Sequence, residues 1–198
     1  MFLIEKEGNE MPPKTKFSRE EIIDRAFEIV RAEGFESLTA RSLAAKMNSS
    51  SRVIFTWFDS MDELKREVLI RAGAEYRKYI EEGLKEPLPF KGAGLKYIEF
   101  AQKESRLFQL LFMGGHREED GPELEPGYRT FVGIIAESHR ISEEDALKLY
   151  LHLWVYSHGI ASMCATHTNP FKEEDISAML SEVFLSLLET YKSGKDTI

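Results

Sequence analysis

Apolar residues recur at the three- to four-residue spacing of an amphipathic helix along almost the whole chain. The first such run extends from Ser18 to Gly34; it opens with the Ser-x-x-Glu pattern of a capping box and ends at a residue typical of helix C-termini. Two shorter runs, at 39–47 and 51–58, are separated by Asn48 and by serines that can cap the following helix. No convincing strand alternation or hairpin turn interrupts these patterns. The sequence therefore predicts an all-α fold of about nine helices.

The second part of the chain carries longer and more apolar helical patterns. Residues 60–80 repeat an apolar position every four residues, which predicts one long helix. A polar segment rich in glycine and proline lies at 114–127, and residues 146–165 are apolar on almost every side, as in a helix buried on more than one face. We therefore divide the chain into four parts: a flexible tail at 1–16, a unit of three short helices at 17–59, a connecting helix at 60–80 and a larger helical unit at 81–198.

Composition limits the classes of protein to which the chain can belong. Its 198 residues are 42% hydrophobic and 30% charged, which is enough to bury a core in one or two small domains. Cys164 is the single cysteine, which excludes an internal disulfide and fits a reducing compartment. No apolar run approaches the roughly 18–20 residues that span a bilayer, and the first residues lack the pattern of a signal peptide. We therefore expect a cytoplasmic protein with no membrane partner.

The charge of the chain is unevenly distributed. The formal net charge is -8, but residues 1–71 hold 12 Lys and Arg against 13 Asp and Glu and so contribute only -1. Within residues 37–58 the only charged side chains are Arg41, Lys46 and Arg52. The overall acidity argues against a protein coated in nucleic acid, but it does not exclude one small anion-binding face near the N-terminus.

Residues 39–58 have the organisation of a helix-turn-helix. In that unit two short helices joined by a tight turn lie over a first stabilising helix, and the second short helix enters the major groove of DNA. Ile54 and Phe58, four residues apart, suit the side that packs on the other helices. Hydroxyl and guanidinium groups on the outer side can bind phosphates or base edges. The outward residues are Ser51, Arg52, Phe55 and Thr56.

Several short motifs between residues 17 and 70 occur in a characteristic order and spacing. They are the capped first helix, Gly34-Phe35, Ser37-Leu38-Thr39, Ala44-Ala45, Ser50, Ile54-Phe55, Trp57-Phe58, and Ser60 with Glu63-Leu64. In this arrangement they resemble the N-terminal DNA-binding domain of the tetracycline-repressor (TetR) family of transcriptional regulators. In the larger unit, "SRLFQLLF" and "WVYSHGIAS" are similar to one ligand-domain subgroup of the same family.

The resemblance implies which residues contact double-stranded DNA. Thr39 and Arg41, at the start of the second helix, correspond to positions that contact phosphates or base edges. The other implied positions are Ser50, Ser51, Arg52, Val53, Phe55, Thr56, Trp57 and Lys65. Helix capping by Ser50 and core packing of Phe55 and Trp57 are alternative roles for these residues.

The chain departs from the family pattern in the turn and in the second short helix. Asn48 and Ser49 stand where the family commonly has glycine and valine, and asparagine tolerates the left-handed backbone that a tight turn demands. Phe55 lacks the aromatic hydroxyl that relatives can use to bind a phosphate, so we expect one phosphate contact fewer.

Aromatic residues are spread over several predicted helices of the larger unit. They suit an apolar ligand pocket and an ordinary core equally well, and both alternatives stay open. The candidate ligand-binding residues are Tyr97, Phe100, Phe112, His116, Phe131, Trp154 and His158. In the pocket alternative, the histidines supply polar contacts to an unknown and largely apolar small molecule.

The last two long helices carry more apolar surface than one protomer can cover. A two-fold symmetric pairing of both helices as a four-helix bundle would bury the excess. The candidate interface residues are Trp154, Ile176, Leu180, Val183, Phe184 and Leu187. We therefore expect a homodimer; a larger monomeric core is the alternative.

Other kinds of site chemistry leave no pattern in the sequence. The five histidines do not pair at helical spacing and no HExxH motif occurs, so we expect no metal and no cofactor. Ser157-His158-Gly159 lacks the spacing of a nucleophile elbow, so no catalytic residue is assigned. The sequence thus predicts a DNA-binding regulator and not an enzyme. The resemblance to the TetR family implies a ligand-responsive repressor, which we expect to bind a palindromic operator as a dimer. An all-helical enzyme with a buried His-containing pocket and a helical protein-interaction adaptor are the alternatives.

Overall fold

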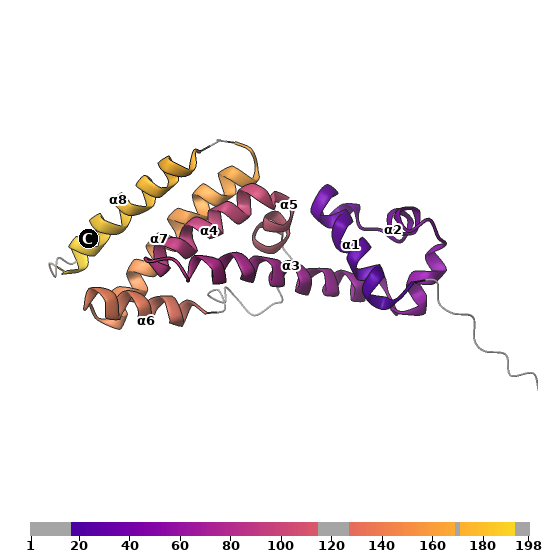
Figure 1. The fold of residues 1–198 in the computed structure, drawn as a ribbon, viewed down its shortest axis with the longest axis horizontal. Coiled ribbons are helices and arrows are strands. Elements are labelled where there is room, and N and C mark those ends of the chain that lie inside the picture. The colour runs from indigo at the N-terminus through magenta and orange to yellow at the C-terminus, as the bar shows by residue number, and fades with distance from the viewer. Residues whose placement is uncertain (1–16, 115–126, 169–170, 193–198) are drawn as a thin grey trace, which may run out of the picture.

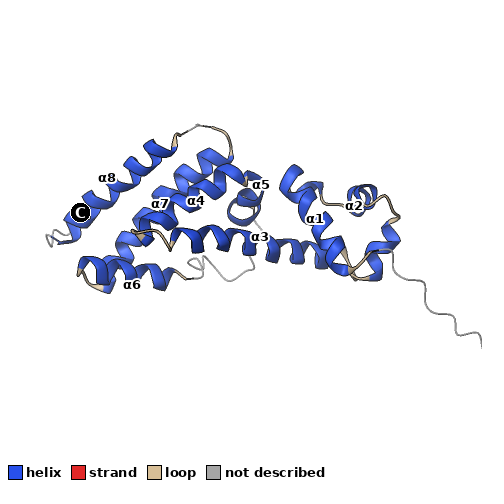
Figure 2. Cartoon of the chain, in the orientation of Figure 1, coloured by secondary structure: helices blue, strands red, loops and turns tan. Residues whose placement is uncertain are grey.

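Helices fill the part of the chain that the computed structural model describes, residues 17–114, 127–168 and 171–192. No β-strand occurs in these ranges (Figure 2). Eight α-helices and a 3₁₀ helix at 51–56 make up nine main helices. The predicted all-α fold is therefore confirmed. The molecule is elongated: a small N-terminal unit and a larger helical unit lie end to end, and one long helix runs through both (Figure 1). No helix in the described part combines the length and the apolar character needed to cross a bilayer.

The small unit contains two α-helices and two short 3₁₀ helices. In chain order these are α1 (Arg19–Glu33), η1 (Phe35–Ser37), α2 (Ala40–Lys46) and η2 (Ser51–Thr56). The predicted capping box opens α1, since the Ser18 hydroxyl accepts from the Glu21 N–H at 3.2 Å and the Glu21 carboxylate accepts from the Ser18 N–H at 2.7 Å. Gly34 ends the helix with φ at 93°, and Asn48 takes a left-handed φ of 46° in the turn after α2. The capping box at Ser18, the stop at Gly34 and the left-handed turn at Asn48 are therefore present as predicted.

The core of the small unit is formed by apolar faces of α1, α2 and η2 that pack against the start of α3 (Met61–Gly83). Ile22, Leu43, Ile54 and Leu64 are fully buried, and Phe58 is nearly so. Burial of an aliphatic or aromatic side chain contributes roughly 1.5–3 kcal/mol relative to exposure. The inward orientation predicted for Ile54 and Phe58 is confirmed, and it fixes which side of η2 faces solvent.

The third helix of the unit is shorter and more tightly wound than its sequence pattern predicts. The pattern covers 51–58, but the structure has only a 3₁₀ helix at 51–56. The Trp57 N–H donates to the carbonyl of Ile54, three residues earlier, at 3.1 Å. β-Branched residues at 53, 54 and 56 lower the preference for a regular α-helix. The segment is therefore positioned mainly by its buried side chains.

The chain reverses direction between α3 and α4 (Pro89–Lys103) in a shorter break than the composition predicts. Glycines and prolines at 87–94 predict an interruption, yet α4 begins inside that segment. Proline is compatible with a first helical turn because the N–H it lacks would have no acceptor there. A Cβ on Gly92 would lie 2.2 Å from the carbonyl oxygen of Gly83, so glycine permits the close approach of the two helix ends.

The larger unit is built from the second half of α3 and the helices that follow it. These are α4, α5 (Ser105–Phe108), the π-helical turn η3 (Gln109–Met113), α6 (Tyr128–His139), α7 (Glu143–Ala165) and α8 (Glu173–Lys192). α4 packs against α3, α7 and α8, while α6 packs against α7. In Figure 1, α4 and α7 lie between α3 and α8. The predicted connecting helix at 60–80 corresponds to α3, which contributes to both units.

α7 buries more than one side of its surface, as its apolar sequence predicts. Leu149 and Leu153 belong to a core shared with α6 and α8, whereas Ile160 and Ala165 belong to a second core that continues into the small unit. Val155 is the large apolar residue of this helix that remains exposed, at 63%.

Candidate nucleic-acid interface and ligand cavity

The outer surface of the small unit consists of α2, the turn after it and η2. Most of the predicted DNA-contact residues are exposed there: Thr39, Arg41, Ser50, Ser51, Arg52, Phe55, Thr56 and Trp57. Phe55 is 48% exposed, so the alternative that it packs in the core does not hold. The local fold thus presents hydroxyls, guanidinium groups and rings on one side, because the apolar residues between them are buried.

The hydroxyl groups of this surface differ in what they bind. Thr39 caps α2, since its hydroxyl accepts from the Ser42 N–H at 3.1 Å. Ser50 is the N-cap residue of η2, but its side chain makes no capping hydrogen bond. The Thr56 hydroxyl donates to the Arg52 carbonyl at 3.2 Å. The Ser50 hydroxyl therefore stays available, as does that of the exposed Ser51, and the capping alternative for Ser50 does not hold.

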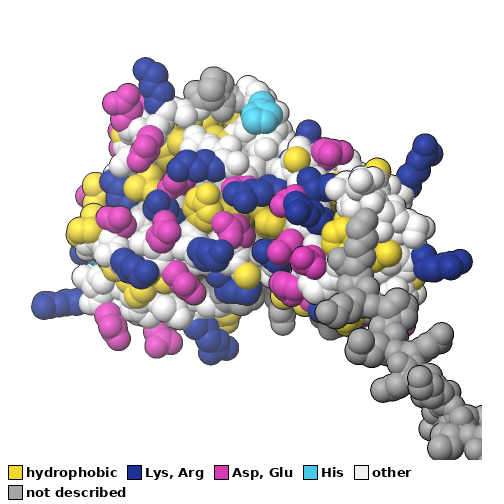
Figure 3. All heavy atoms as spheres, turned by 45° about the vertical axis from the view of Figure 1, so that its right-hand side comes forward, with side chains coloured by type: hydrophobic (Ala, Val, Ile, Leu, Met, Phe, Trp, Pro, Cys, Tyr) yellow, Lys and Arg dark blue, Asp and Glu magenta, His cyan; other side chains and the backbone are white. Residues whose placement is uncertain are grey.

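Arg41 and Arg52 are the exposed cations of this surface. Neither forms an ion pair with a carboxylate in the part of the chain that the structure describes. Lys46, the third cation of the acid-free segment, instead contacts Glu28 at 3.2 Å. In Figure 3, cationic side chains project from the far end of the small unit, and acidic ones gather near its junction with the larger unit. Guanidinium groups without carboxylate partners suit contacts with phosphates or base edges.

Three of the predicted contact residues are also tied to the protein itself. Trp57 is 40% exposed, and its indole N–H donates to the Phe17 carbonyl at 2.9 Å. Val53 is half-buried against the core, and the Lys65 ammonium lies 5.2 Å from the centre of the Phe35 ring. Trp57 can therefore offer its ring to DNA but not its N–H, while Val53 and Lys65 also support the shape of the surface.

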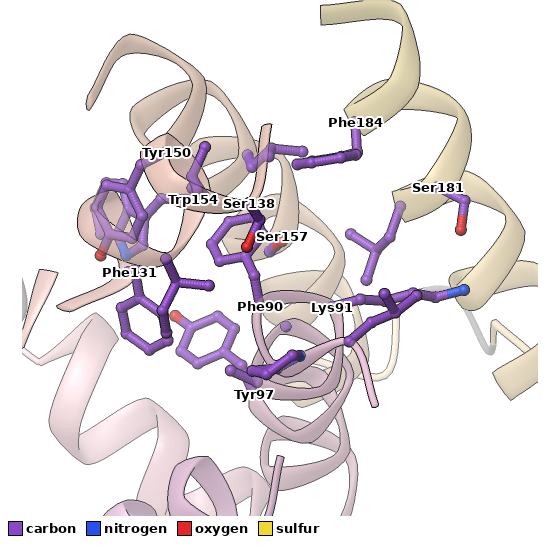
Figure 4. A pocket seen from close by; sticks show the side chains of 18 of the residues that line it. Phe90, Lys91, Tyr97, Phe131, Ser138, Tyr150, Trp154, Ser157, Ser181 and Phe184 are labelled. Carbon is purple, nitrogen blue, oxygen red and sulfur yellow. The ribbon is translucent and has the colours of Figure 1, made fainter. Parts of the chain in front are cut away.

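A cavity of about 550 Å³ lies in the larger unit among α3, α4, α6, α7 and α8 (Figure 4). Cavities of roughly 300–1,000 Å³ accommodate small organic ligands. Aromatic rings dominate its walls: Tyr76, Phe90, Tyr97, Phe131, Tyr150, Trp154 and Phe184. Phe131 and Tyr150 stack with their ring centroids 5.9 Å apart and their planes at 12°. Leu88 and Leu185 line the cavity and are largely exposed, so they lie where it opens to solvent.

A small number of polar groups interrupts the apolar walls. Besides the hydroxyls of the three tyrosines, they are Lys91, Ser138, His139, Ser157 and Ser181. Burial lowers the pKa of His139, and the nearby Lys192 lowers it further, so the imidazole is neutral at neutral pH. Its ring packs against Phe184 with centroids 5.0 Å apart. The cavity therefore combines hydrogen-bonding groups with a single permanent charge, that of Lys91.

The structure corrects the position of two predicted ligand-binding residues. Tyr97, Phe131 and Trp154 line the cavity as predicted, but Phe100 and Phe112 do not. Phe100 is fully buried, with its ring 5.4 Å from that of Tyr76 on α3. Phe112 packs on the same tyrosine with centroids 5.1 Å apart. Both rings point toward α3 because they lie on the side of α4 and η3 that faces it, and they contribute to the core.

The two candidate histidines also lie elsewhere than predicted. His158 does not line the cavity; its Nδ1 is 2.8 Å from the Tyr97 hydroxyl, and its ring stacks on Trp154 with centroids 5.5 Å apart. It is therefore a packing and hydrogen-bonding residue behind two of the cavity walls. His116 falls outside the described residues.

Sequence reasoning missed several residues that line the cavity. Tyr150 and Ser157 lie four residues before and three residues after Trp154 on α7, so following the helical face of Trp154 would have found them. Phe184 was assigned to the dimer interface, and Phe90 lies in the segment read as a break. Their contribution depends on how α8 and the start of α4 pack, for which the sequence carries no local signal.

The predicted interface residues on α8 are mostly used inside the protomer. Ile176 and Leu180 are buried at 2% and 6% exposure, so they cannot form the contact surface predicted for them. Trp154 and Phe184 line the cavity, and Val183 and Leu187 are partly buried against the core shared by α6, α7 and α8. The packing of α8 on α4 and α7 covers this face. Large apolar side chains that remain exposed on these helices are Val155 and Leu185.

A charged contact joins the small unit to the larger one. Arg31, in the last turn of α1, binds both carboxylate oxygens of Glu104, with its Nε donating to Oε2 at 2.8 Å. Glu104 is buried and lies at the break between α4 and α5. The hydrogen bonds to Glu104 raise the pKa of Arg31. α4 therefore contacts the cavity at its first turns and the small unit at its end.

Residues that could bind a metal are dispersed in the described ranges, where no three His, Cys, Asp or Glu side chains converge. Cys164 is buried, and burial raises the pKa of its thiol. The thiol is therefore protonated at neutral pH, and it extends from α7 toward Gln102 of α4, whose Nε2 lies 3.7 Å from Sγ.

Comparisons with known proteins find similarity over both units. The family of tetracyclin repressor-like C-terminal domains matches residues 90–187. An uncharacterised HTH-type transcriptional regulator of Mycobacterium tuberculosis is 24% identical over 181 residues, which cover 87% of this chain and 80% of that protein. A TetR-like transcriptional regulator from Rhodococcus sp. RHA1 has a similar fold, with a TM-score of 0.64, 16% identity and coverage of 91% of this chain and 100% of that one. A structure described as a transcriptional regulator from Pseudomonas aeruginosa PAO1 has a TM-score of 0.67 at 17% identity, covering 90% and 96% of the two chains.

Proposed function

We propose that the chain is a transcriptional regulator of the TetR type, which its similarity to such proteins supports. It binds a palindromic operator as a homodimer and releases it when a largely apolar small molecule fills the cavity. The observation that carries this proposal is the outer surface of α2 and η2. It presents Arg41 and Arg52 without carboxylate partners among the described residues, and it is held in place by the buried Ile54 and Phe58.

A single small unit reads too few base pairs for tight and specific binding. Helix-turn-helix proteins therefore use two copies, set about 34 Å apart so that both reach successive major grooves on one side of the duplex. Val155 and Leu185, exposed at 63% and 62%, support pairing of two protomers through α7 and α8. An isologous contact needs only one self-complementary surface, and its two-fold axis explains a palindromic operator.

The proposed release depends on α4. Lys91 and Tyr97 of α4 line the cavity, and Glu104 just after its end binds Arg31 of the small unit. A ligand that prefers one position of α4 therefore also prefers one position of the small unit. It can change operator affinity only by the ratio of its affinities for the two arrangements, typically 5- to 150-fold.

The test begins with selection of binding sites from a random pool of double-stranded DNA, followed by fluorescence anisotropy on the selected duplex. We expect palindromic sites with half-sites about one or more helical turns apart. If Arg52 reads a base, Arg52→Ala should lose about 1–3 kcal/mol of binding free energy and relax the preference at one base pair. If Arg41 binds a phosphate, Arg41→Ala should reduce the slope of the logarithm of the binding constant against the logarithm of the salt concentration by about one.

The matched control is Arg129→Ala, which removes an exposed guanidinium from the larger unit. It should bind the selected duplex like wild type. Failure of the wild-type protein to enrich any sequence, or equal behaviour of all three variants, contradicts the proposed surface.

A further inference from the structure

We infer that the cavity binds an organic anion, in which a carboxylate is attached to a bulky apolar body that carries one hydrogen-bonding group. This inference rests on the proposed function and specifies the class of its ligand.

The walls of the cavity contain a cation but no acid. Lys91 is the only Lys or Arg among the described residues that line it, and none of them is Asp or Glu. His139 is neutral at neutral pH because burial lowers its pKa. A cationic ligand would therefore lose its hydration without gaining a counter-ion, whereas an anion finds one.

Lys91 is available to such an anion. It forms no ion pair with a carboxylate of the described residues, whereas Lys96, on the same helix, contacts Glu82 at 3.5 Å and Glu99 at 2.8 Å. Figure 4 shows the amino group of Lys91 at the edge of the cavity, directed toward α8 on the side of Ser181. A carboxylate at this edge would contact the ammonium group while it remains partly solvated.

The start of α4 strengthens the positive potential at the same edge. Lys91 lies in the first turn of this 15-residue helix, and no side chain caps its N-terminus. The first N–H groups of a helix have no acceptor within it, and the helix dipole places partial positive charge there. Because Pro87, Leu88 and Phe90 of the same segment line the cavity, this end of the helix borders the ligand space.

A buried hydroxyl indicates a second polar point deeper in the cavity. Ser157 is 8% exposed, lines the cavity, and makes no hydrogen bond to another described residue. Its hydroxyl borders the cavity space, where a carbonyl or hydroxyl of the ligand would replace water as its hydrogen-bond partner. The aromatic walls around it, including Phe131 and Trp154, accommodate an apolar and ring-containing body.

The charge preference is tested by calorimetric titration at pH 7.5 with three probes that share one body: 4-(2-naphthyl)butanoate, its primary amide and the corresponding primary amine. We expect the carboxylate to bind best and the amine at least tenfold more weakly. Lys91→Met should weaken carboxylate binding about fivefold and leave amide binding unchanged. The control, Lys103→Met, removes an exposed charge from the same helix outside the cavity and should change neither.

The buried hydroxyl is tested with 4-(2-naphthyl)-4-oxobutanoate, which adds a carbonyl to the same body. It should bind wild type more tightly than the unsubstituted acid, and Ser157→Ala should remove that advantage. The inference is overturned if the amine binds as well as the carboxylate, if Lys91→Met weakens all probes equally, or if folded wild type binds none of them. The wild-type series alone decides the charge preference if a variant does not fold.

Operator binding of the same preparations separates this inference from the proposed function. Selective carboxylate binding by a protein that enriches no DNA sequence overturns the regulator proposal and leaves the ligand class intact. Operator binding without carboxylate preference overturns only the ligand class.

Discussion

Breaking the contact between Arg31 and Glu104 is expected to destabilise the protein and to weaken the communication between its two units. The two residues are 73 positions apart in the chain, and their contact joins the end of α1 to the break between α4 and α5. The side chain of Glu104 is 7% exposed, whereas that of Arg31 is 49% exposed. Replacing Arg31 should therefore change the free energy of unfolding by a different amount than replacing Glu104.

The magnitudes follow from this asymmetry. Arg31→Met leaves a buried carboxylate without its partner, which costs 3–5 kcal/mol in a fully buried pair; because water reaches the guanidinium side, we expect about 1–2 kcal/mol here. Glu104→Gln keeps the shape and one hydrogen-bond acceptor and leaves a guanidinium that water can solvate, so we expect about 1 kcal/mol. The double variant should lose less than the sum, with a coupling energy of about 1 kcal/mol.

The assay is urea denaturation of wild type, both single variants and the double variant, followed by far-UV circular dichroism. Arg25→Met is the control, because Arg25 forms an exposed ion pair with Glu28 within α1 and does not reach the larger unit. It should unfold like wild type. Operator affinity is then compared with and without a bound ligand, and Arg31→Met should respond several-fold less than wild type. Additive effects in the double variant, or an undiminished ligand response, would refute this reasoning.

Three further perturbations test other parts of the account. Ile54→Ala should destabilise the small unit by about 2–5 kcal/mol because its side chain is fully buried, whereas Phe55→Ala should unfold like wild type; equal denaturation midpoints would contradict the assigned faces of η2. Val155→Glu combined with Leu185→Glu should give folded monomers in sedimentation equilibrium, and persistence of a dimer would place the interface elsewhere. His139 has a lowered pKa, so the unfolded chain takes up its proton first below about pH 6.5. Wild type should therefore lose stability on acidification from pH 7.5 to 5.5 more steeply than His139→Gln, and equal slopes would show that the imidazole is not held neutral by the fold.

The sequence by itself determined the features that depend on neighbours within a few residues. The capping box of Ser18, the left-handed turn at Asn48 and the inward faces of Ile54 and Phe58 were all predicted and are present. Each follows from local hydrogen bonding or from the 3.6-residue period, which identifies the apolar side of a helix from its own residues. The all-α fold and the exposed outer side of η2 could be predicted for the same reason.

Tertiary structure alone decided which buried faces meet one another. Phe100 and Phe131 look equivalent in the sequence, yet the first packs against α3 and the second lines the cavity. Leu180 belongs to an apolar stripe predicted to form an interface, but the packing of α8 buries it inside the protomer. The contact of Arg31 with Glu104 joins residues that no local period relates. Helical period shows that a side chain is buried, but the partner that buries it depends on how separate helices pack, and that is fixed by the summed contacts of the whole core.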